Sequence, residues 1–245
     1  MVESGFPADP GGGASRRSSA QAAPSVDTAG LDISDAAGNG VLITFEGIDG
    51  CGKTTQLELL AAELESLGFD VLRTREPGGT RLGESIREAL LDARNDGMFP
   101  RAEALLYAAA RAQLVEEVIR PALAAGRVVL SDRYVDSSLA YQGYGRELGH
   151  NDIIILNAWA TDHLFPRVTL LFTVDPDVRR SRMKADSDRL EGEGEEFFRK
   201  VEEGYLQLAN DHRHRISVID ANGSIEQVYA QVRHSVDEAL GLFGG

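Results

Sequence analysis

The chain has 245 residues, enough for one sizeable core, and its composition of 42% hydrophobic and 26% charged residues is that of a soluble globular protein. A formal net charge of −14 argues against a protein that binds the phosphate backbone of nucleic acids, because such binding needs a basic surface. It does not exclude a small phosphorylated ligand, which needs only a few local cations. The single cysteine, Cys51, excludes an internal disulfide and fits a reducing compartment, and no apolar run approaches the ~18 residues of a membrane span. We therefore expect a cytoplasmic protein without nucleic-acid or membrane partners.

Residues 1–40 differ from the rest of the chain in composition. They are rich in Ala, Gly, Ser and Pro and show no sustained apolar periodicity, which predicts a disordered low-complexity tail. They lack the apolar core of a signal peptide, and their acidic residues argue against a transit peptide. The folded domain is predicted to cover residues 41–245.

From residue 41 onward, short β-rich runs alternate with longer helical segments. Five runs have the composition of strands: Val41–Phe45, Val71–Thr74, Val128–Ser131, Val168–Val174 and Ile216–Ile219. Four of them read as buried on both sides, which suits a parallel sheet covered by helices on both faces. The pattern predicts an α/β fold of three layers around a five-stranded parallel sheet.

Two helix boundaries can also be read from the sequence. After the first strand, leucines recur at helical spacing until Gly68, which is predicted to end that helix: Leu57, Leu60, Leu64 and Leu67. After the fourth strand, Asp175-Pro176 reads as an N-cap followed by proline at the first helical position.

The segment after the first strand matches the phosphate-binding pattern G-x-x-x-x-G-K-[ST] and opens a helix, as that motif requires. Its glycines let backbone N–H groups face a phosphate, and the helix N-terminus adds positive dipole. Lys53 is expected to reach the β- and γ-phosphates of ATP, and the Thr54 hydroxyl to bind Mg²⁺. The predicted nucleotide-binding residues are Gly47, Ile48, Asp49, Gly50, Cys51, Gly52, Lys53, Thr54 and Thr55.

A second apolar run, Val128–Asp132, ends in an acid. In P-loop proteins an aspartate at the carboxyl end of a strand supports Mg²⁺, whereas elsewhere such a residue is often only a cap. Combined with the phosphate loop, Asp132 is predicted to support the metal.

The phosphate loop contains a carboxylate, Asp49, which is unexpected where an anion binds. A guanine-reading Asn-Lys-x-Asp motif is not present in the sequence, which argues against a GTPase switch. The chain has the right size for a small-molecule kinase, in which a second substrate sits opposite ATP. Asp49 can then point toward a hydroxyl of that substrate; the alternative is a charge that only favours the helix entry.

Five sequence blocks occur in an order that is familiar from one family: Phe45–Thr55, Thr74–Thr80, Asp132–Tyr134, Ala140–Gly143 and Asp188–Glu191. Together they resemble thymidylate kinase, from about residue 41 to the C-terminus. The resemblance implies a P-loop kinase fold, ATP-dependent phosphorylation of dTMP to dTDP in dTTP synthesis, and a homodimer. It also implies that Asp49 accepts a hydrogen bond from the 3′-hydroxyl of dTMP.

The resemblance further assigns roles to residues of the dTMP site. Tyr107, where most relatives have Phe, would stack on thymine, and Arg111 would hydrogen-bond the base; without the resemblance, an aromatic at this helical spacing is more often part of the core. Arg87 and Arg133 would bind the dTMP phosphate, for which a planar guanidinium is suited. Tyr141 would lie against the 2′ carbon of the sugar. The remaining assigned positions are Ser138 and Gln142, which face the base, and Glu76, an acid near the phosphate and the Mg²⁺ site.

The variable positions of the phosphate loop contain no arginine, although phosphoryl transfer needs cations on the moving group. The run Arg179–Lys184 resembles the basic lid of the bacterial subclass of the family. Arg180, Arg182 and Lys184 would then act in catalysis with Lys53 and Arg133; Lys184 stands where some relatives have arginine. The alternative interpretation of this run is a solvated basic helix face.

Two rival functions stay open at this point. The chain could be a kinase for another nucleoside monophosphate, or a non-catalytic nucleotide-binding module. Intact Lys53, Thr54 and Asp132, together with the basic run, argue against a pure binder, which needs no lid cations. ATP turnover with a panel of monophosphates would separate the three hypotheses.

Overall fold

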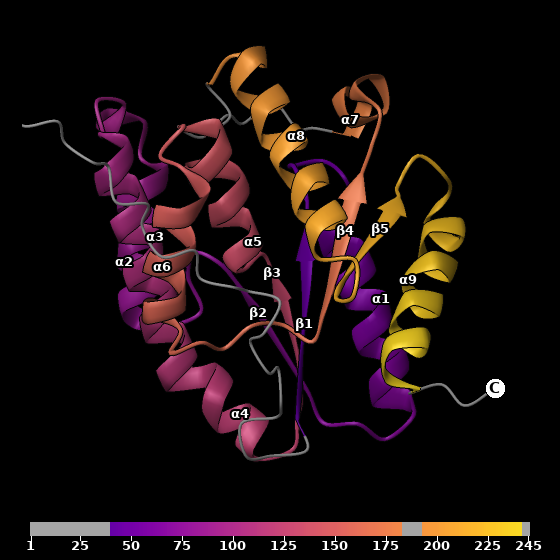
Figure 1. Ribbon diagram of the computed structural model, residues 1–245. Coiled ribbons are helices and arrows are strands. Elements are labelled where there is room, and N and C mark those ends of the chain that lie inside the picture. Colours follow the sequence, from indigo (N-terminus) through magenta and orange to yellow (C-terminus); the bar gives the residue numbers. More distant parts are fainter. Residues whose placement is uncertain (1–39, 183–192, 242–245) are drawn as a thin grey trace, which may run out of the picture.

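The computed structural model describes residues 40–182 and 193–241, and within these ranges five strands form one parallel sheet in the order β2-β3-β1-β4-β5 (Figure 1). The strands are β1 (Val41–Glu46), β2 (Val71–Arg75), β3 (Val128–Asp132), β4 (Val168–Thr173) and β5 (Ile216–Asp220). The predicted fold class and all five predicted strands are confirmed. The tail, apart from Gly40, lies outside the described residues, as do Lys184 and the block 188–191.

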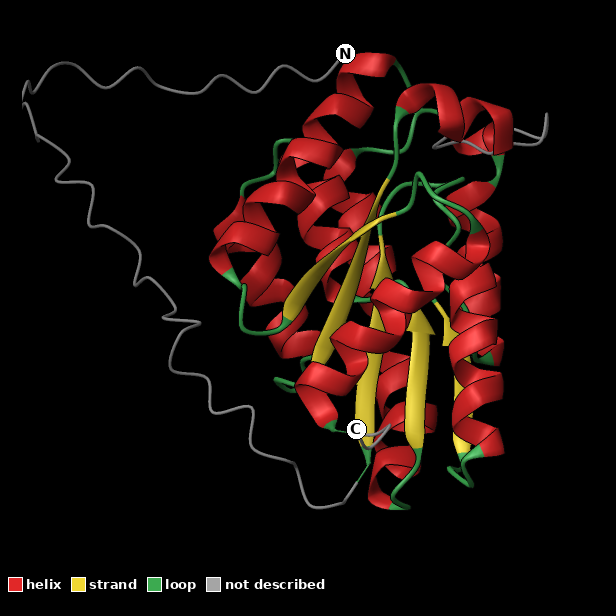
Figure 2. Cartoon of the chain, turned by 90° about the vertical axis from the view of Figure 1, so that its right-hand side faces the viewer, coloured by secondary structure: helices red, strands yellow, loops and turns green. Residues whose placement is uncertain are grey.

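Helices cover both faces of the sheet (Figure 2). They are α1 (Lys53–Ser66), α2 (Arg81–Leu91), α3 (Pro100–Leu114), α4 (Arg120–Ala124), α5 (Val135–Ser138), α6 (His150–Ala160), α7 (Pro176–Arg182), α8 (Glu195–Asp211) and α9 (Ile225–Leu240). Three shorter segments are the 3₁₀ turn η2 (Ala93–Asn95) and the π-helical turns η3 (Val115–Ile119) and η4 (Leu139–Gly145). None of the helices in the described ranges combines the length and apolar character needed to cross a membrane.

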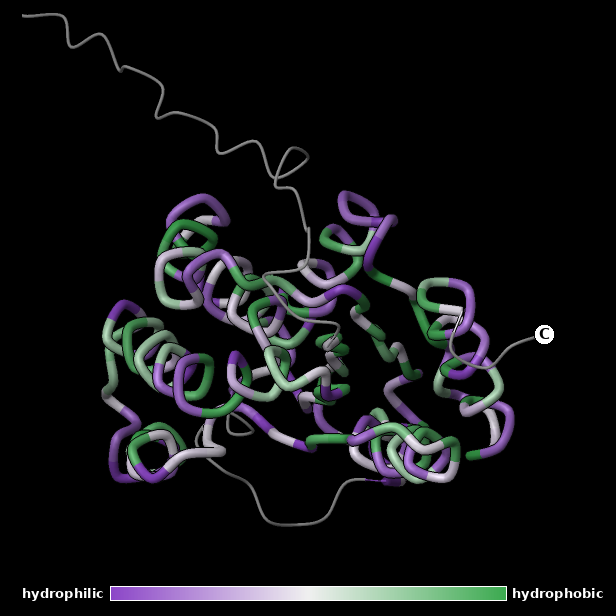
Figure 3. Tube along the Cα trace, turned by 90° about the horizontal axis from the view of Figure 1, so that it is seen from below, coloured by the Kyte–Doolittle hydropathy of each residue, from purple (hydrophilic) through white to green (hydrophobic). Residues whose placement is uncertain are grey.

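Two apolar cores hold the three layers together. On one face, α1 and α9 pack against side chains such as Ile43 and Phe45, and the Phe45 ring stacks on Phe172 with 5.9 Å between centroids. On the other face, residues of α3, α5, η4, α6 and α8 form a second cluster against the sheet. In Figure 3, which views the protein from below, hydrophobic and hydrophilic residues alternate around the coils of these helices. Each helix therefore contributes one apolar side to the core.

The position of a strand in the sheet decides how much of it is buried. The central strands β1, β3 and β4 are almost wholly buried, but the edge strands β2 and β5 are partly exposed. Four strands were predicted to be buried, whereas the structure buries three. Edge strands have a neighbour on one side only, and composition alone does not show where the edges fall.

The helix boundaries agree with the predicted signals except at one leucine. Leu57, Leu60 and Leu64 are buried, and Gly68 has φ +92° just after the end of α1. Leu67, however, is the C-cap residue and is 53% exposed, so it does not belong to the buried stripe. At α7, the backbone N–H of Arg179 donates to the Asp175 carbonyl at 2.9 Å, as expected when the helix begins at Pro176.

Candidate active site

Two cavities open at the carboxyl-terminal edge of the sheet, where parallel α/β sheets bind ligands. The larger, of about 610 Å³, is lined by the loop after β1, the start of α1 and the segment between β5 and α9. The smaller, of about 290 Å³, is lined by residues that follow β2 and β3 and by residues of α2, α3, α5 and η4. Asp49 contributes to the lining of both. The two cavities therefore meet at this carboxylate.

The loop between β1 and α1 has a backbone that requires glycine. Gly47 has φ +132°, and a Cβ atom there would lie 2.5 Å from the carbonyl oxygen of Phe172. Gly50 and Gly52 have φ +84° and +97°, in the left-handed region that favours glycine, and Gly52 is the N-cap of α1. A glycine-rich turn that leads into a helix N-terminus is the arrangement that holds phosphate through backbone N–H groups. The predicted strand–loop–helix context of the motif is confirmed.

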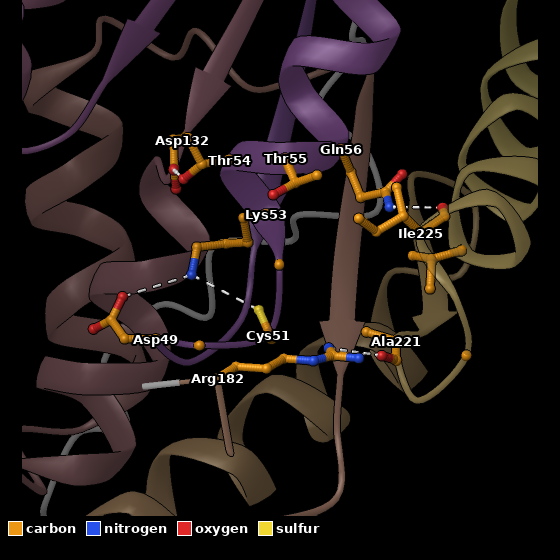
Figure 4. A pocket seen from close by; sticks show the side chains of 14 residues that line it. Asp49, Cys51, Lys53, Thr54, Thr55, Gln56, Asp132, Arg182, Ala221 and Ile225 are labelled. Carbon is orange, nitrogen blue, oxygen red and sulfur yellow. Dashed lines mark hydrogen bonds and ion pairs between the residues drawn. The ribbon is translucent and has the colours of Figure 1, made fainter. Parts of the chain in front are cut away.

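Lys53 lies at the first turn of α1 with its side chain folded along the loop (Figure 4). Its ammonium group donates to the carbonyl oxygens of Gly47 and Ile48, both at 3.0 Å, and lies 3.7 Å from the Asp49 carboxylate. Lys53 is 5% exposed, so its charge acts where water screens it weakly. The cation is thus held at the wall of the larger cavity.

Thr54 and Asp132 are the pair that fits a magnesium ion. The Thr54 hydroxyl donates to Oδ2 of Asp132 at 2.8 Å (Figure 4). They come together because β1 and β3 are neighbours, with Phe45 opposite Asp132. Hydroxyl and carboxylate oxygens are ligands of the type Mg²⁺ prefers. No group of three or more His, Cys, Asp or Glu side chains in the described ranges could hold a metal, so phosphate and water oxygens would have to complete the coordination.

The Asp49 side chain points toward Arg133, which lines the smaller cavity. Its Oδ1 accepts from Nη2 of Arg133 at 2.7 Å, and the Lys53 ammonium lies 3.7 Å from the same oxygen. Burial alone would raise the pKa of Asp49, but Arg133, Lys53 and Arg179 together hold it well below its ordinary value. Asp49 is therefore an anion between cations, which explains how a phosphate loop tolerates it.

Arg133 follows β3 in a strained backbone conformation. Its φ is +73°, a left-handed value that costs a residue with a Cβ about 1–2 kcal/mol. Its guanidinium also donates to the Ser137 hydroxyl at 3.1 Å and lies over the Tyr141 ring, 5.2 Å from the centroid. Strain of this kind persists where the surroundings over-determine it, which is typical of functional sites.

Glu76 and Arg111 form a buried ion pair behind the smaller cavity. Nε of Arg111 donates to Oε2 of Glu76 at 2.7 Å, and the same guanidinium donates to Ser138 and Asn157 and to the carbonyl oxygen of Tyr134. Burial raises the pKa of Glu76 against the influence of Arg111, and its Oε1, although buried, has no hydrogen-bond partner. Glu76 lines the cavity, as predicted for the dTMP site. Arg111 does not line it but donates hydrogen bonds to two residues that do, Glu76 and Ser138. A direct bond from Arg111 to a base stays a prediction.

The π-helical turn η4 presents Tyr141 and Gln142 to the smaller cavity. The Gln142 amide nitrogen donates to the buried carboxylate of Glu103 at 3.0 Å, and Arg146 pairs with the same carboxylate at 3.0 Å. The Tyr141 hydroxyl is buried without a partner, and burial raises its pKa. π-Helical turns occur often at functional sites because they redirect individual side chains.

Two more predicted residues line the smaller cavity from the neighbouring helices α2 and α3. Arg87 donates to the carbonyl oxygen of Pro77 at 3.0 Å, and Tyr107 lies one helical turn before Arg111. The predicted substrate residues are thus brought to one cavity, with Arg111 buried beneath it.

The basic run of α7 is divided among three environments. Arg182 extends along the wall of the larger cavity and donates to the Ala221 carbonyl at 2.9 Å (Figure 4). Arg180 is exposed and pairs with Asp177. Arg179, to which no role was assigned, donates to the backbone carbonyl of Asp49 at 2.9 Å and thereby ties α7 to the phosphate loop. Lys184 lies outside the described residues.

Three residues next to the site carry no motif that would have predicted them: Glu46, Glu103 and Tyr205. Glu46 is wholly buried at the end of β1 beside Ser137 and Tyr205, and Glu103 holds Gln142. The available signal for Glu46 was an acid as the last residue of a buried apolar strand. Nothing local indicated Tyr205, because it arrives from α8, far along the chain.

Comparison with known proteins agrees with this geometry. Residues 45–232 match the sequence profile of the family described as thymidylate kinase. The chain is 50% identical over 202 residues to a thymidylate kinase of Caldanaerobacter subterraneus subsp. tengcongensis, covering 82% of this chain and 97% of that protein. It is 49% identical over 203 residues to one of Bifidobacterium longum, covering 82% and 98%. The crystal structure of thymidylate kinase from Ehrlichia chaffeensis superposes with a TM-score of 0.68 at 34% identity, covering 81% of this chain and 98% of that one. The chain belongs to the thymidylate kinase family.

Proposed function

We propose a division of labour between the two cavities for the family reaction, in which dTMP is phosphorylated to dTDP with ATP. ATP occupies the larger cavity, with its phosphates on the loop Gly47–Gly52, and dTMP occupies the smaller one. The observation that carries this assignment is the shared wall: Asp49 lines both cavities and pairs with a cation from each side, Lys53 and Arg133. Two phosphate-bearing substrates can therefore meet end to end at this point.

On the ATP side, Lys53 leaves its carbonyl partners to bind the β- and γ-phosphates, for which its position at the loop is suited. Thr54 and Asp132 hold Mg²⁺, which when bound neutralises charge on the phosphates. Arg180, Arg182 and Lys184 place further positive charge around the transferred group. Arg182 already lines the cavity.

On the dTMP side, Asp49 accepts from the 3′-hydroxyl, and Arg133 and Arg87 bind the phosphate. Glu76 lies beside that phosphate with one carboxylate oxygen unpartnered. Tyr107 stacks on thymine above Arg111. The base edge and the sugar are contacted by Ser138, Gln142 and Tyr141.

The chemical step is a direct transfer. A phosphate oxygen of dTMP attacks the γ-phosphorus, a new P–O bond forms, the bond from the γ-phosphorus to the bridging oxygen breaks, and ADP leaves with the electron pair. Positioning and fixed positive charge supply most of the catalysis in such reactions. Arg133 holds the attacking phosphate while Lys53 holds the donor.

The protein acts as a homodimer through α3 and α6, which pack side by side. These helices carry large apolar side chains at the surface: Leu105 is 58% exposed, Ile155 49% and Trp159 82%. Light scattering at micromolar concentration tests this directly.

The free thiol of Cys51 is consistent with action in the cytoplasm.

The test of the substrate assignment is ATP turnover with dTMP, dCMP, dGMP and AMP. We expect the highest kcat/KM for dTMP, because a site that pairs with one base edge leaves buried polar groups unsatisfied when the wrong base enters. Equal values for dTMP and AMP would contradict the assignment. Nucleotide binding without turnover of any monophosphate would favour a pure binding module.

A further inference from the structure

Glu46 lines neither cavity, but it is hydrogen-bonded to Ser137, which lines the smaller one. It is the last residue of β1, wholly buried, and its carboxylate accepts from three donors. The Tyr134 backbone N–H binds Oε1 at 2.7 Å. The hydroxyls of Ser137 and Tyr205 both bind Oε2, at 2.6 and 3.0 Å.

The same two hydroxyls are the partners of Arg133. Nη1 of Arg133 lies 3.1 Å from Ser137 Oγ and 3.4 Å from Tyr205 Oη. A hydroxyl has one hydrogen and two lone pairs, whereas a guanidinium can only donate. The two hydroxyl oxygens also lie 2.9 Å from each other, so each hydrogen goes either to Glu46 or to the other hydroxyl. In each of these arrangements both oxygens keep a lone pair for Arg133.

Glu46 also acts on the backbone of Arg133. It accepts a hydrogen bond from the backbone N–H of Tyr134, which directly follows Arg133 and its left-handed φ of +73°. A buried N–H without a partner is costly, so this bond stabilises the strained turn. The carboxylate therefore holds Arg133 at its main chain and, through two hydroxyls, at its side chain.

We propose that Glu46 is a positioning residue for dTMP: it orients the Ser137 and Tyr205 hydroxyls so that they accept from Arg133 and fix its guanidinium beside Asp49. This inference rests on the proposed role of Arg133 in binding the dTMP phosphate. It assigns to a residue outside both cavities an indirect influence on the binding of dTMP, through Arg133.

The alternative is that Glu46 only satisfies buried donors. The two views differ for Glu46→Gln, which keeps the volume of the side chain. The amide oxygen can still accept from the Tyr134 N–H, but its NH₂ group must donate to the hydroxyls. One hydroxyl can then donate to the other, which lies 2.9 Å away, but the remaining hydrogen turns toward Arg133 and repels its guanidinium. A purely structural role would lower stability without selecting between substrates.

The experiment measures KM and kcat for dTMP and for ATP in Glu46→Gln, with and without Arg133→Ala. We expect kcat/KM for dTMP to fall roughly tenfold, as on losing a hydrogen bond to a charged group, while the KM for ATP changes less than about twofold. In the Arg133→Ala background the same substitution should have no further effect. Equal losses in both backgrounds would overturn the proposal.

A milder matched pair covers the case in which Glu46→Gln fails to fold. Tyr205→Phe and Tyr134→Phe each remove the hydroxyl of a buried tyrosine, but the Tyr134 hydroxyl donates to the Leu164 carbonyl and does not face Arg133. Only Tyr205→Phe should raise the KM for dTMP. Equal KM values for dTMP in the two variants would contradict the proposal. Wild-type turnover of dTMP is measured first, so that a failure of the proposed function is recognised separately.

Discussion

The two cavities are built in different ways although they share a wall. The larger one is formed mainly by a continuous stretch, residues 49–56, in which backbone shape matters more than side chains. The smaller one is formed by side chains from separate elements, each held by a charged partner: Glu76 by Arg111, Asp49 by Arg133 and Gln142 by Glu103. A backbone cradle is local, whereas a site of paired buried charges is part of the core. Substitutions on the two sides should therefore fail in different ways.

The largest effect is expected for Arg111→Met on the acceptor side. Removing the cation leaves Glu76 buried without its partner, which typically costs about 3–5 kcal/mol. Urea denaturation should show this loss in the free energy of unfolding. As a control, Arg180→Met removes an arginine of an exposed pair and should cost less than about 1 kcal/mol. Similar losses in the two variants would show that the acceptor site is not part of the core.

On the donor side, Lys53→Met should damage chemistry more than stability. Loss of a charge that stabilises the transferred phosphoryl group costs about 10²–10³ in rate. The single-turnover rate should fall by this amount while equilibrium binding of dTMP stays within about twofold. A parallel collapse of dTMP affinity would mean that the cavities are not separate in function.

Asp49→Asn probes the shared wall. The substitution removes the charge of the carboxylate that we propose as acceptor of the dTMP 3′-hydroxyl, and such an interaction is worth about 1.5–3 kcal/mol. Isothermal titration should show weaker dTMP binding with ATP affinity near normal. If ATP binding is lost and dTMP binding survives, Asp49 serves the donor side.

The smallest effect is expected for Gln56→Ala at the far end of the donor cavity. The Gln56 amide donates to the Ile225 carbonyl at 3.1 Å, linking α1 to the start of α9 (Figure 4). Its loss should weaken ATP binding by about 1 kcal/mol and leave dTMP binding unchanged. An effect on dTMP instead would contradict the separation of the two sites.

The sequence by itself determined what depends on local pattern. Glycines and a lysine at fixed spacing predicted the phosphate loop, because a left-handed turn before a helix needs glycine at defined positions. Apolar β-rich runs predicted all five strands, the motif blocks predicted the family, and the resemblance predicted most of the residues that line the smaller cavity.

Only the tertiary structure decided which strands are edges, and which charges meet. Arg111 was expected at the base, yet four partners from separate parts of the chain surround it beneath the cavity. Glu46 gained its place because Tyr205 arrives from α8, 159 residues later. Such pairs have no periodicity in the sequence. They form because a buried charge or hydroxyl must find a partner wherever the fold brings one within hydrogen-bond distance.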